Sequence, residues 1–394
     1  MDASRLLALP RELRDQVYEH LLHPSANRTR SEEDGRITYH WDLNIYRVNH
    51  QIHEESKSVF RRLNCFIKIY TIFPESDRYL SQENYVTFIS SGRPAELFAD
   101  HHLSIYIESS YTFQHGLFKY LLHIDDLEWF SQIWFYSALG SPGINQHLEV
   151  TVTLHNPYST SLYDNPVPKN LQKRLLEPFG KVKQLQSISF KGNPYPSIEK
   201  AVREEMEIPY MTAEKCLEAA VQFKEEGNIA LKANRPEDAI ESYIKSFEAI
   251  HIVIVNKRRK DYADRFFGAA PELTSGPYKG RLAYTAWLTI RIQLVANVVF
   301  AYLKLENWEM AYHWGNRSIQ LMRDTVGTVE SEPYTGLPGV PVSDQLGRIY
   351  YRTSVAAKQM GDKTEARALL RVAMKYLPND RTVATEHASV ALRI

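Results

Sequence analysis

Residues 224–243 have the sequence KEEGNIALKANRPEDAIESY, which predicts two helices joined by a tight turn. Gly227 and Ala230 are small, so the first helix can approach a partner helix closely. Asn234-Arg235 turns the chain, and Pro236 with the two acidic residues after it begins the second helix. Proline is tolerated at the first helical position, and the helix dipole favours negative charge there. The stretch therefore predicts a closely packed helix pair.

Two later stretches repeat this pattern. They are NVVFAYLKLENWEMA at 297–311 and RIYYRTSVAAKQMG at 348–361, the latter continuing in the same pattern to Pro378. Ala239, Ala311 and Ala366 occupy one repeat position, the small residue of the second helix. All three copies resemble the tetratricopeptide repeat (TPR), a helix pair with a period of about 34 residues. The resemblance implies an all-α superhelix that binds other proteins.

The three alanines are separated by 72 and 55 residues, both more than the repeat period. Two long insertions are therefore predicted, one containing residues 270–277 and the other residues 336–341, both rich in Gly and Pro. We expect both to be mobile and no strand to follow Lys191. Gly315 stands where the second copy should have a bulky residue, which weakens that copy. The predicted TPR domain spans 206–394, with repeats at about 214–250, 287–323 and 346–379.

The first 205 residues predict a mixed α+β domain. Helical spacing and alternating apolar residues occur in turn along this part of the chain. A Pro-rich stretch (Pro194, Pro196, Pro209) is predicted to link it to the repeats. The predicted helices are 9–22, 43–63, 117–139 and 170–179, and the predicted strands are 65–70, 103–108, 148–154 and 186–191.

The N-terminal helices carry a second resemblance. LPRELR at 9–14, followed by YRVNHQIHEES at 46–56, is similar to the F-box-like segments that open many fungal proteins. The resemblance covers only about residues 9–60 and implies binding to a ubiquitin-ligase scaffold. The alternative is that two amphipathic helices pack on the following sheet and have no further role.

The repeats also resemble one TPR subclass, the co-chaperones whose first helices clamp a carboxylate-ended peptide. Its pattern is Lys-x-x-x-Asn on the first repeat, Asn on the second and Lys-x-x-x-Arg on the third. The matching residues are Lys224 and Asn228, then Asn297, then Arg348 and Arg352, with Arg348 in place of lysine. Residues four apart share a helix face, and charge-assisted hydrogen bonds to a carboxylate are strong. The alternative is that these are ordinary residues of solvated helix faces.

Composition excludes several classes of function. Lys and Arg total 47, as do Asp and Glu, so the chain lacks the basic excess of a nucleic-acid-binding domain. The two cysteines, Cys65 and Cys216, fall in different predicted domains, which favours a reducing compartment, and we expect the cytoplasm or the nucleus. The apolar stretch 287–305 contains Arg291 and Lys304, so it predicts a buried helix and no membrane span.

No local motif in the sequence predicts catalysis or metal binding. His50 and His53, with two glutamates after them, lack a second ligand cluster, so neither a metal nor another cofactor is predicted. No phosphate-binding glycine loop or nucleophile elbow occurs, and the protein is expected not to be an enzyme, although a dispersed active site would leave no local signature. The basic run Lys257–Lys260 suggests a solvated helix end, a nuclear-import signal or a patch for an acidic partner.

Two functional hypotheses follow. The first is an adaptor whose groove binds the C-terminal tail of a cytosolic heat-shock chaperone. The second is an F-box-type receptor of a ubiquitin ligase, with the repeats holding the substrate. Both have protein partners, and neither involves nucleic acid or a membrane.

Overall fold

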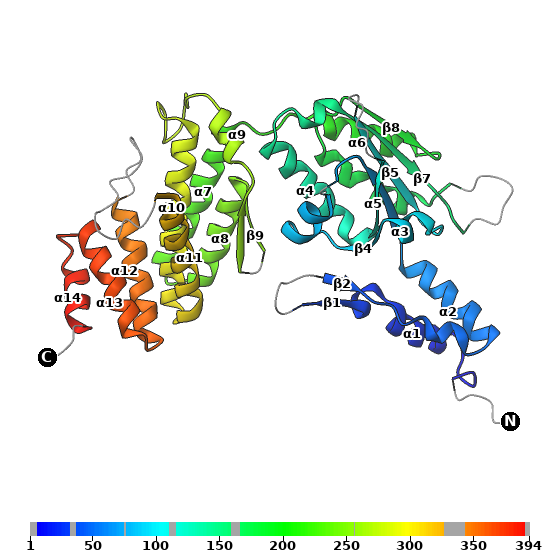
Figure 1. Ribbon diagram of the computed structural model, residues 1–394, viewed down its shortest axis with the longest axis horizontal. Coiled ribbons are helices and arrows are strands. Elements are labelled where there is room, and N and C mark those ends of the chain that lie inside the picture. Colours follow the sequence, from blue (N-terminus) through cyan, green and yellow to red (C-terminus); the bar gives the residue numbers. More distant parts are fainter. Residues whose placement is uncertain are drawn as a thin grey trace. The chain divides into compact units, whose positions relative to one another are not determined.

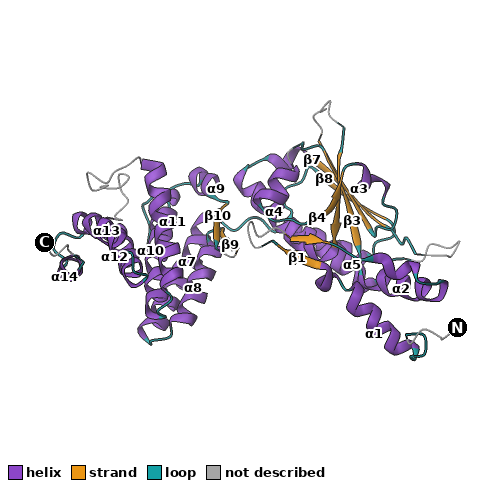
Figure 2. Cartoon of the chain, turned by 60° about the horizontal axis from the view of Figure 1, so that its bottom comes forward, coloured by secondary structure: helices purple, strands orange, loops and turns teal. Residues whose placement is uncertain are grey.

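The computed structural model describes residues 6–31, 37–74, 76–109, 116–158, 166–255, 257–326 and 343–390. The chain forms two compact units, unit 1 (Met1–Tyr210) and unit 2 (Met211–Ile394) (Figure 1). Unit 1 combines helices with a sheet, and unit 2 is mostly helical, as Figure 2 shows.

Unit 1 is built around a six-stranded mixed sheet. Its strands are β3 (Phe66–Thr71), β4 (Phe88–Ser91), β5 (Leu103–Ser109), β6 (Phe118–His123), β7 (Leu148–Leu154) and β8 (Ser187–Lys191). The strand order is β4-β6-β3-β5-β7-β8, in which β3–β5 and β7–β8 are parallel and the other pairs are antiparallel. Along β7 the apolar residues are buried and the polar ones between them are half-buried or exposed, which is the alternation that predicted it.

The helices of unit 1 are α1 (Arg11–Leu22), α2 (His50–Leu63), α3 (Arg93–Leu97), α4 (Leu127–Gly140), α5 (Lys169–Leu176) and α6 (Pro196–Glu207). Short helical turns lie at η1 (Pro24–Asn27), η2 (Leu43–Arg47), η3 (Asp77–Glu83), η4 (Ile124–Asp126), η5 (Ile144–His147) and η6 (Glu177–Lys181). A separate antiparallel pair is formed by β1 (Arg28–Arg30) and β2 (Ile37–Tyr39).

Three predictions for unit 1 were wrong in detail. The stretch 117–139 was predicted to be helical throughout, but it begins with β6, because a short apolar run fits a buried strand as well as a helix. The helix predicted at 43–63 is interrupted at Asn49, whose side chain accepts from the Ile52 amide and caps α2. The predicted linker contains α6, which Pro196 begins at a position where proline costs no hydrogen bond.

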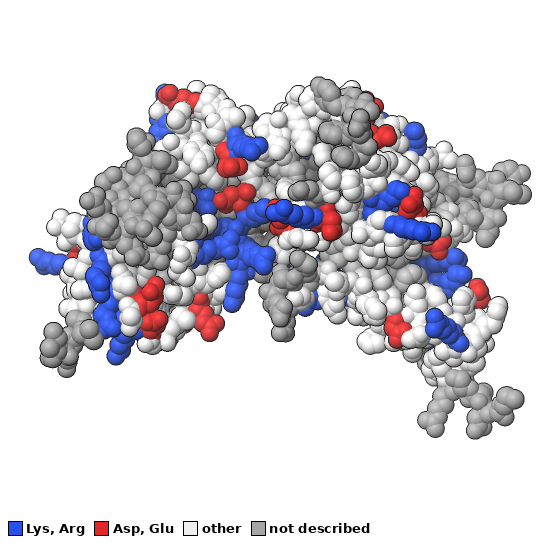
Figure 3. Space-filling model, in the orientation of Figure 1, with Lys and Arg blue, Asp and Glu red and all other residues white. Residues whose placement is uncertain are grey.

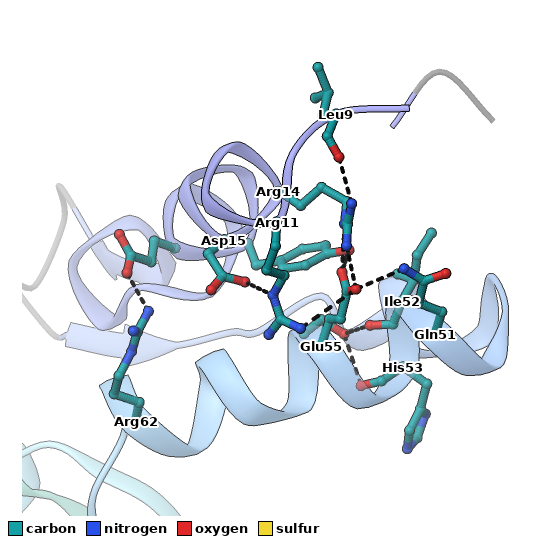
Figure 4. A network of polar contacts seen from close by, with 12 residues as sticks. Leu9, Arg11, Arg14, Asp15, Gln51, Ile52, His53, Glu55 and Arg62 are labelled. Atoms are coloured by element: carbon teal, nitrogen blue, oxygen red, sulfur yellow. Dashed lines mark hydrogen bonds and ion pairs between the residues drawn. The ribbon is translucent and has the colours of Figure 1, made fainter. Parts of the chain in front are cut away.

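Apolar residues recur every four positions at Leu9, Leu13, Val17 and Leu21, just before and along α1, but the buried face of α1 is a different one. Arg14, Tyr18 and Leu22 are buried, and Arg14 donates from Nε and Nη2 to the Glu55 carboxylate of α2 at 2.8 and 2.6 Å. Figure 4 shows this network between the two helices, with the Leu9 side chain pointing away from α2. The four apolar side chains therefore lie on the outside of the helix pair. Leu9, Leu13, Val17 and Leu21 are 37, 44, 37 and 46% exposed.

Unit 2 is a row of helix pairs. The first pair is α7 (Ala213–Lys232) and α8 (Pro236–Ala249), the second α10 (Ala283–Lys304) and α11 (Trp308–Val326), and the third α12 (Ser343–Gln359) and α13 (Lys363–Tyr376), followed by α14 (Arg381–Ser389). The first helix of each pair contacts the first helix of the next, α7 to α10 and α10 to α12. This is TPR-like packing, and we call the first helices the A helices and the second the B helices.

The A helix α10 lies at the centre of unit 2. By length and composition alone it could cross a membrane. It is packed between α7, α8, α11 and α12, however, and residues such as Trp287, Ile290 and Leu294 belong to the core of the unit. The prediction of a buried helix at 287–305 therefore agrees with its surroundings.

Two glycines set the distance between helices. A Cβ on Gly227 of α7 would lie 2.5 Å from the Tyr243 ring of α8, closer than real Cβ contacts allow. A Cβ on Gly315 of α11 would collide with the Thr353 side chain of α12, whose own Cβ would be 2.9 Å away. Gly315 is thus a packing requirement between the second and third pairs. Its departure from the repeat pattern does not weaken the second copy.

The first insertion contains regular structure that the sequence pattern did not predict. It contains an antiparallel hairpin, β9 (Ile252–Val255) and β10 (Arg258–Asp261), then α9 (Asp264–Ala269). The expectation of no strand after Lys191 was therefore wrong, because four β-branched residues in a row at 252–255 favour a strand. The predicted mobile segment also bonds to α7, since the amides of Thr274 and Ser275 donate to Glu214 at 2.8 and 2.5 Å. The second predicted insertion, at 336–341, lies outside the described residues.

Candidate functional site

The five residues predicted to bind a carboxylate all lie on the A helices. Lys224 and Asn228 are on α7, Asn297 is on α10, and Arg348 and Arg352 are on α12. The Asn297 amide donates from Nδ2 to Oδ1 of Asn228 at 2.9 Å. Lys224 donates from Nζ to Gln293 of α10 at 2.8 Å. The first two A helices are therefore joined through the predicted residues themselves.

Arg352 reaches back from α12 to α10. Its Nη1 donates to the main-chain oxygen of Ala296 at 2.5 Å, and its guanidinium lies 4.5 Å from the centre of the Phe300 ring. Burial, and then the charge of Arg348, lower the pKa of Arg352 to about 10. The side chain is therefore still a cation at neutral pH, held beside the Asn297 turn of α10.

Arg348 differs from the other four. Its side chain is exposed, one turn before Arg352 on the same helix. Within the described part of the chain it has neither a hydrogen bond nor an ion pair. It is the predicted residue that is most available to a ligand from outside.

A carboxylate of the chain itself already contacts this group. Glu225 lies 3.5 Å from the Lys224 ammonium, and its Oε2 accepts from Nδ2 of Asn228 at 3.1 Å. The Oδ1 of Asn228 accepts from Tyr243 as well as from Asn297, so both ends of this amide are occupied. The Glu225 side chain is 56% exposed, so it can move away into solvent.

Sequence reasoning missed four residues of this group: Glu225, Tyr243, Gln293 and Phe300. Spacing held a signal for Glu225, because residues three apart on a helix are neighbours and Glu225 precedes Asn228 by three. Gln293 and Phe300 had the same signal, since they lie four and three residues from Asn297 on α10, whereas Tyr243 lies on α8 and became visible only through packing.

The group suits binding better than catalysis. Ammonium and guanidinium groups attract anions, and together with the amides they supply hydrogen-bond donors. A peptide carboxylate is an acceptor of matching charge.

A polar cluster in unit 1 is the nearest approach to catalytic geometry. The Ser104 hydroxyl lies 2.9 Å from Nε2 of His101 and 2.8 Å from Nε2 of His155. Burial first, and then the nearby His155, lower the pKa of His101 to about 4, so its ring is neutral at pH 7. Ser104 is 4% exposed, which keeps its hydroxyl from a substrate. Among the described residues no group of His, Cys, Asp and Glu could hold a metal ion, and His53 instead contacts the Tyr46 carbonyl.

No protein-family model matches the chain, and no curated protein sequence matches it. Among solved structures, it is similar to the C-terminal TPR-containing domain of an FK506-binding protein from Plasmodium falciparum. That match has 16% identity and a TM-score of 0.30, and it covers 46% of this chain and 91% of the other. At that score the likeness supports no argument, so the description of unit 2 as TPR-like depends on its own helix packing.

Proposed function

We propose that the protein is an interaction adaptor and that the A helices of unit 2 bind a peptide ending in a free carboxylate. The tail of a cytosolic heat-shock chaperone is such a peptide. The observation that carries this proposal is the contact between Asn228 and Asn297, which brings the amides of two repeats together beside Lys224. Arg352, bonded to Ala296 on the same stretch of α10, places a further cation nearby.

The test uses the full chain and a short peptide ending in Glu-Glu-Val-Asp, as the free acid and as the C-terminal amide. We expect micromolar affinity for the acid, about −8 kcal/mol, and much weaker binding of the amide, because amidation removes one charge and leaves the apolar contacts unchanged. Equal affinities for the two peptides would show that the A helices do not recognise the terminal carboxylate.

Variants locate the site. Arg352→Ala should weaken binding of the acid at least tenfold and reduce the preference for acid over amide, since it removes a cation and leaves the bound carboxylate unpaired. Arg348→Lys should have a small effect, because lysine keeps the charge. The matched control is Arg371→Ala, on the exposed face of α13, which should leave the affinity unchanged.

A second candidate function is favoured by α1. Leu9, Leu13, Val17 and Leu21 form an exposed stripe, which we call the α1 stripe. An exposed apolar stripe on a helix is typical of a protein-binding surface. This supports the F-box-type hypothesis, in which α1 binds a ubiquitin-ligase scaffold. The test is capture of purified scaffold protein by the full chain and by a Leu13→Asp variant, and equal capture by both would contradict it.

A further inference from the structure

The β9–β10 hairpin is attached to the B helices. β9 contacts α8, and two main-chain oxygens of the hairpin accept hydrogen bonds from α11. His313 contacts the Lys257 oxygen through Nε2 at 2.8 Å, and Arg317 donates from Nη2 to the Arg259 oxygen at 2.8 Å. Through these contacts the hairpin is bound to α8 and α11, which carry none of the five residues of the candidate peptide site.

Arg259 is a buried cation without a full set of partners. Its side chain is 8% exposed and lies over Trp314, with 5.5 Å between the guanidinium carbon and the ring centre. Nη2 donates to the Ser318 hydroxyl at 3.2 Å. Nε and Nη1 are buried and have no acceptor among the described residues. A buried charge with unpaired donors is costly, and an anion would supply the acceptors that these donors need.

Two more guanidinium groups lie close to Arg259. Arg291 of α10 pairs with Asp261 at 2.6 Å, and Arg317 of α11 has a buried Nε for which the described part of the chain offers no acceptor. Burial, followed by the charge of Arg291, lowers the pKa of Arg259 to about 9, and Arg317 acts in the same direction. Among the described residues Asp261 is the carboxylate that faces this cluster, and its Oδ1 has no donor there. Three guanidinium groups and one carboxylate leave a net charge of about +2 at neutral pH.

The outer side of the hairpin is also basic. Lys257 and Arg258 are exposed, and Lys260 is half-buried. Figure 3 shows Lys and Arg side chains gathered over the part of unit 2 where the hairpin lies. An anion approaching from solvent would therefore meet a positive potential before it reached the buried cluster.

We propose that Arg259, Arg291 and Arg317 form a binding site for a phosphate dianion, either free or as a monoester on a side chain of a protein partner. Guanidinium groups pair with phosphate oxygens through several hydrogen bonds at once, which is why arginine is the usual residue for phosphate recognition. A dianion also matches the net charge of the cluster, whereas a carboxylate would neutralise only half of it. Because Nε and Nη1 of Arg259 are buried, binding requires the hairpin to shift outward.

The experiment measures binding to the full chain by calorimetry at constant ionic strength. The probes are inorganic phosphate, a phosphoserine peptide, and the same peptide with unmodified serine. Tighter binding of the phosphopeptide than of phosphate identifies a partner side chain as the source, and equal binding identifies free phosphate. If neither probe binds more tightly than chloride or the unmodified peptide, the proposal is wrong.

Variants assign the effect to the cluster. Arg317→Gln, at the half-buried edge, should weaken phosphate binding at least tenfold, and Arg371→Gln is the matched control. Arg259→Met keeps an apolar stem and removes the unpaired charge. It should abolish binding and raise the melting temperature of the ligand-free protein. If Arg259 were only structural, the melting temperature would fall and Arg317→Gln would leave binding unchanged, which would overturn the proposal.

Discussion

The amide of Asn297 donates a hydrogen bond to Oδ1 of Asn228, 2.9 Å away, and so joins α10 to α7. Tyr243 donates to the same oxygen from α8. The Asn228 side-chain oxygen thus links α7, α8 and α10. The Nδ2 of Asn228 faces Glu225, so a peptide carboxylate would compete with Glu225 for this donor.

Glu225→Gln should therefore strengthen binding of the carboxylate-ended peptide. The substitution removes a negative charge beside Lys224 and Asn228, and the repulsion of two charges at about 4 Å in water is about 1 kcal/mol. We expect roughly three- to tenfold tighter binding in a titration with the free-acid peptide. Glu226→Gln is the matched control, since Glu226 is exposed and bonds to Gln222 instead. Equal gains for both variants would mean that only overall charge matters.

Gly315→Ala should destabilise unit 2. The added Cβ would collide with Thr353, and overpacking of this kind costs about 1–3 kcal/mol, which exceeds the roughly 1 kcal/mol that alanine gains over glycine in helix propensity. Gly268→Ala is the control, because nothing lies within 4 Å of its Cβ position in α9. Urea unfolding of both variants checks this. If Gly315→Ala lowers the free energy of unfolding no more than Gly268→Ala does, the close approach of α11 and α12 is contradicted.

Gly315 also illustrates what sequence patterns could and could not reveal. The repeat spacing predicted the three helix pairs, because the small residues that let helices pack recur along the chain. The same pattern marked Gly315 as an exception, because a pattern for one repeat contains no information about the next repeat. Thr353 of that next repeat occupies the space that a side chain at position 315 would need. For a similar reason, the sequence pattern could not predict which face of α1 is buried. The partner of Arg14 is Glu55, 41 residues away, and periodicity alone gives no sign that a charged residue is the buried one.

Stability should depend on Glu55 at acid pH. Its hydrogen bonds from Arg14 lower the pKa of the Glu55 carboxyl to about 2 from an ordinary 4.5. A lowered pKa in the folded state means that the stabilisation is complete above pH 4.5 and is lost as the pH falls from there toward 2. The melting temperature of the wild type should exceed that of Glu55→Gln at pH 7, and the difference should shrink between pH 4.5 and pH 2. Glu54→Gln, an exposed neighbour, should show no such change.

Leu21 and Leu22 offer a matched test of which face of α1 is buried. They are adjacent and chemically identical, yet Leu21 is 46% exposed and Leu22 is fully buried. Leu22→Ala should cost about 2–5 kcal/mol, because it leaves a cavity between α1 and α2, whereas a surface substitution such as Leu21→Ala should stay within about 0.5 kcal/mol. Urea unfolding measures both. Binding to the ubiquitin-ligase scaffold should show the opposite order. Leu21→Ala removes part of the α1 stripe and should weaken scaffold binding. Leu22→Ala should leave scaffold binding unchanged at temperatures where the protein is folded. Similar losses of stability for both leucines would mean that the α1 stripe is packed in solution and unavailable to a partner.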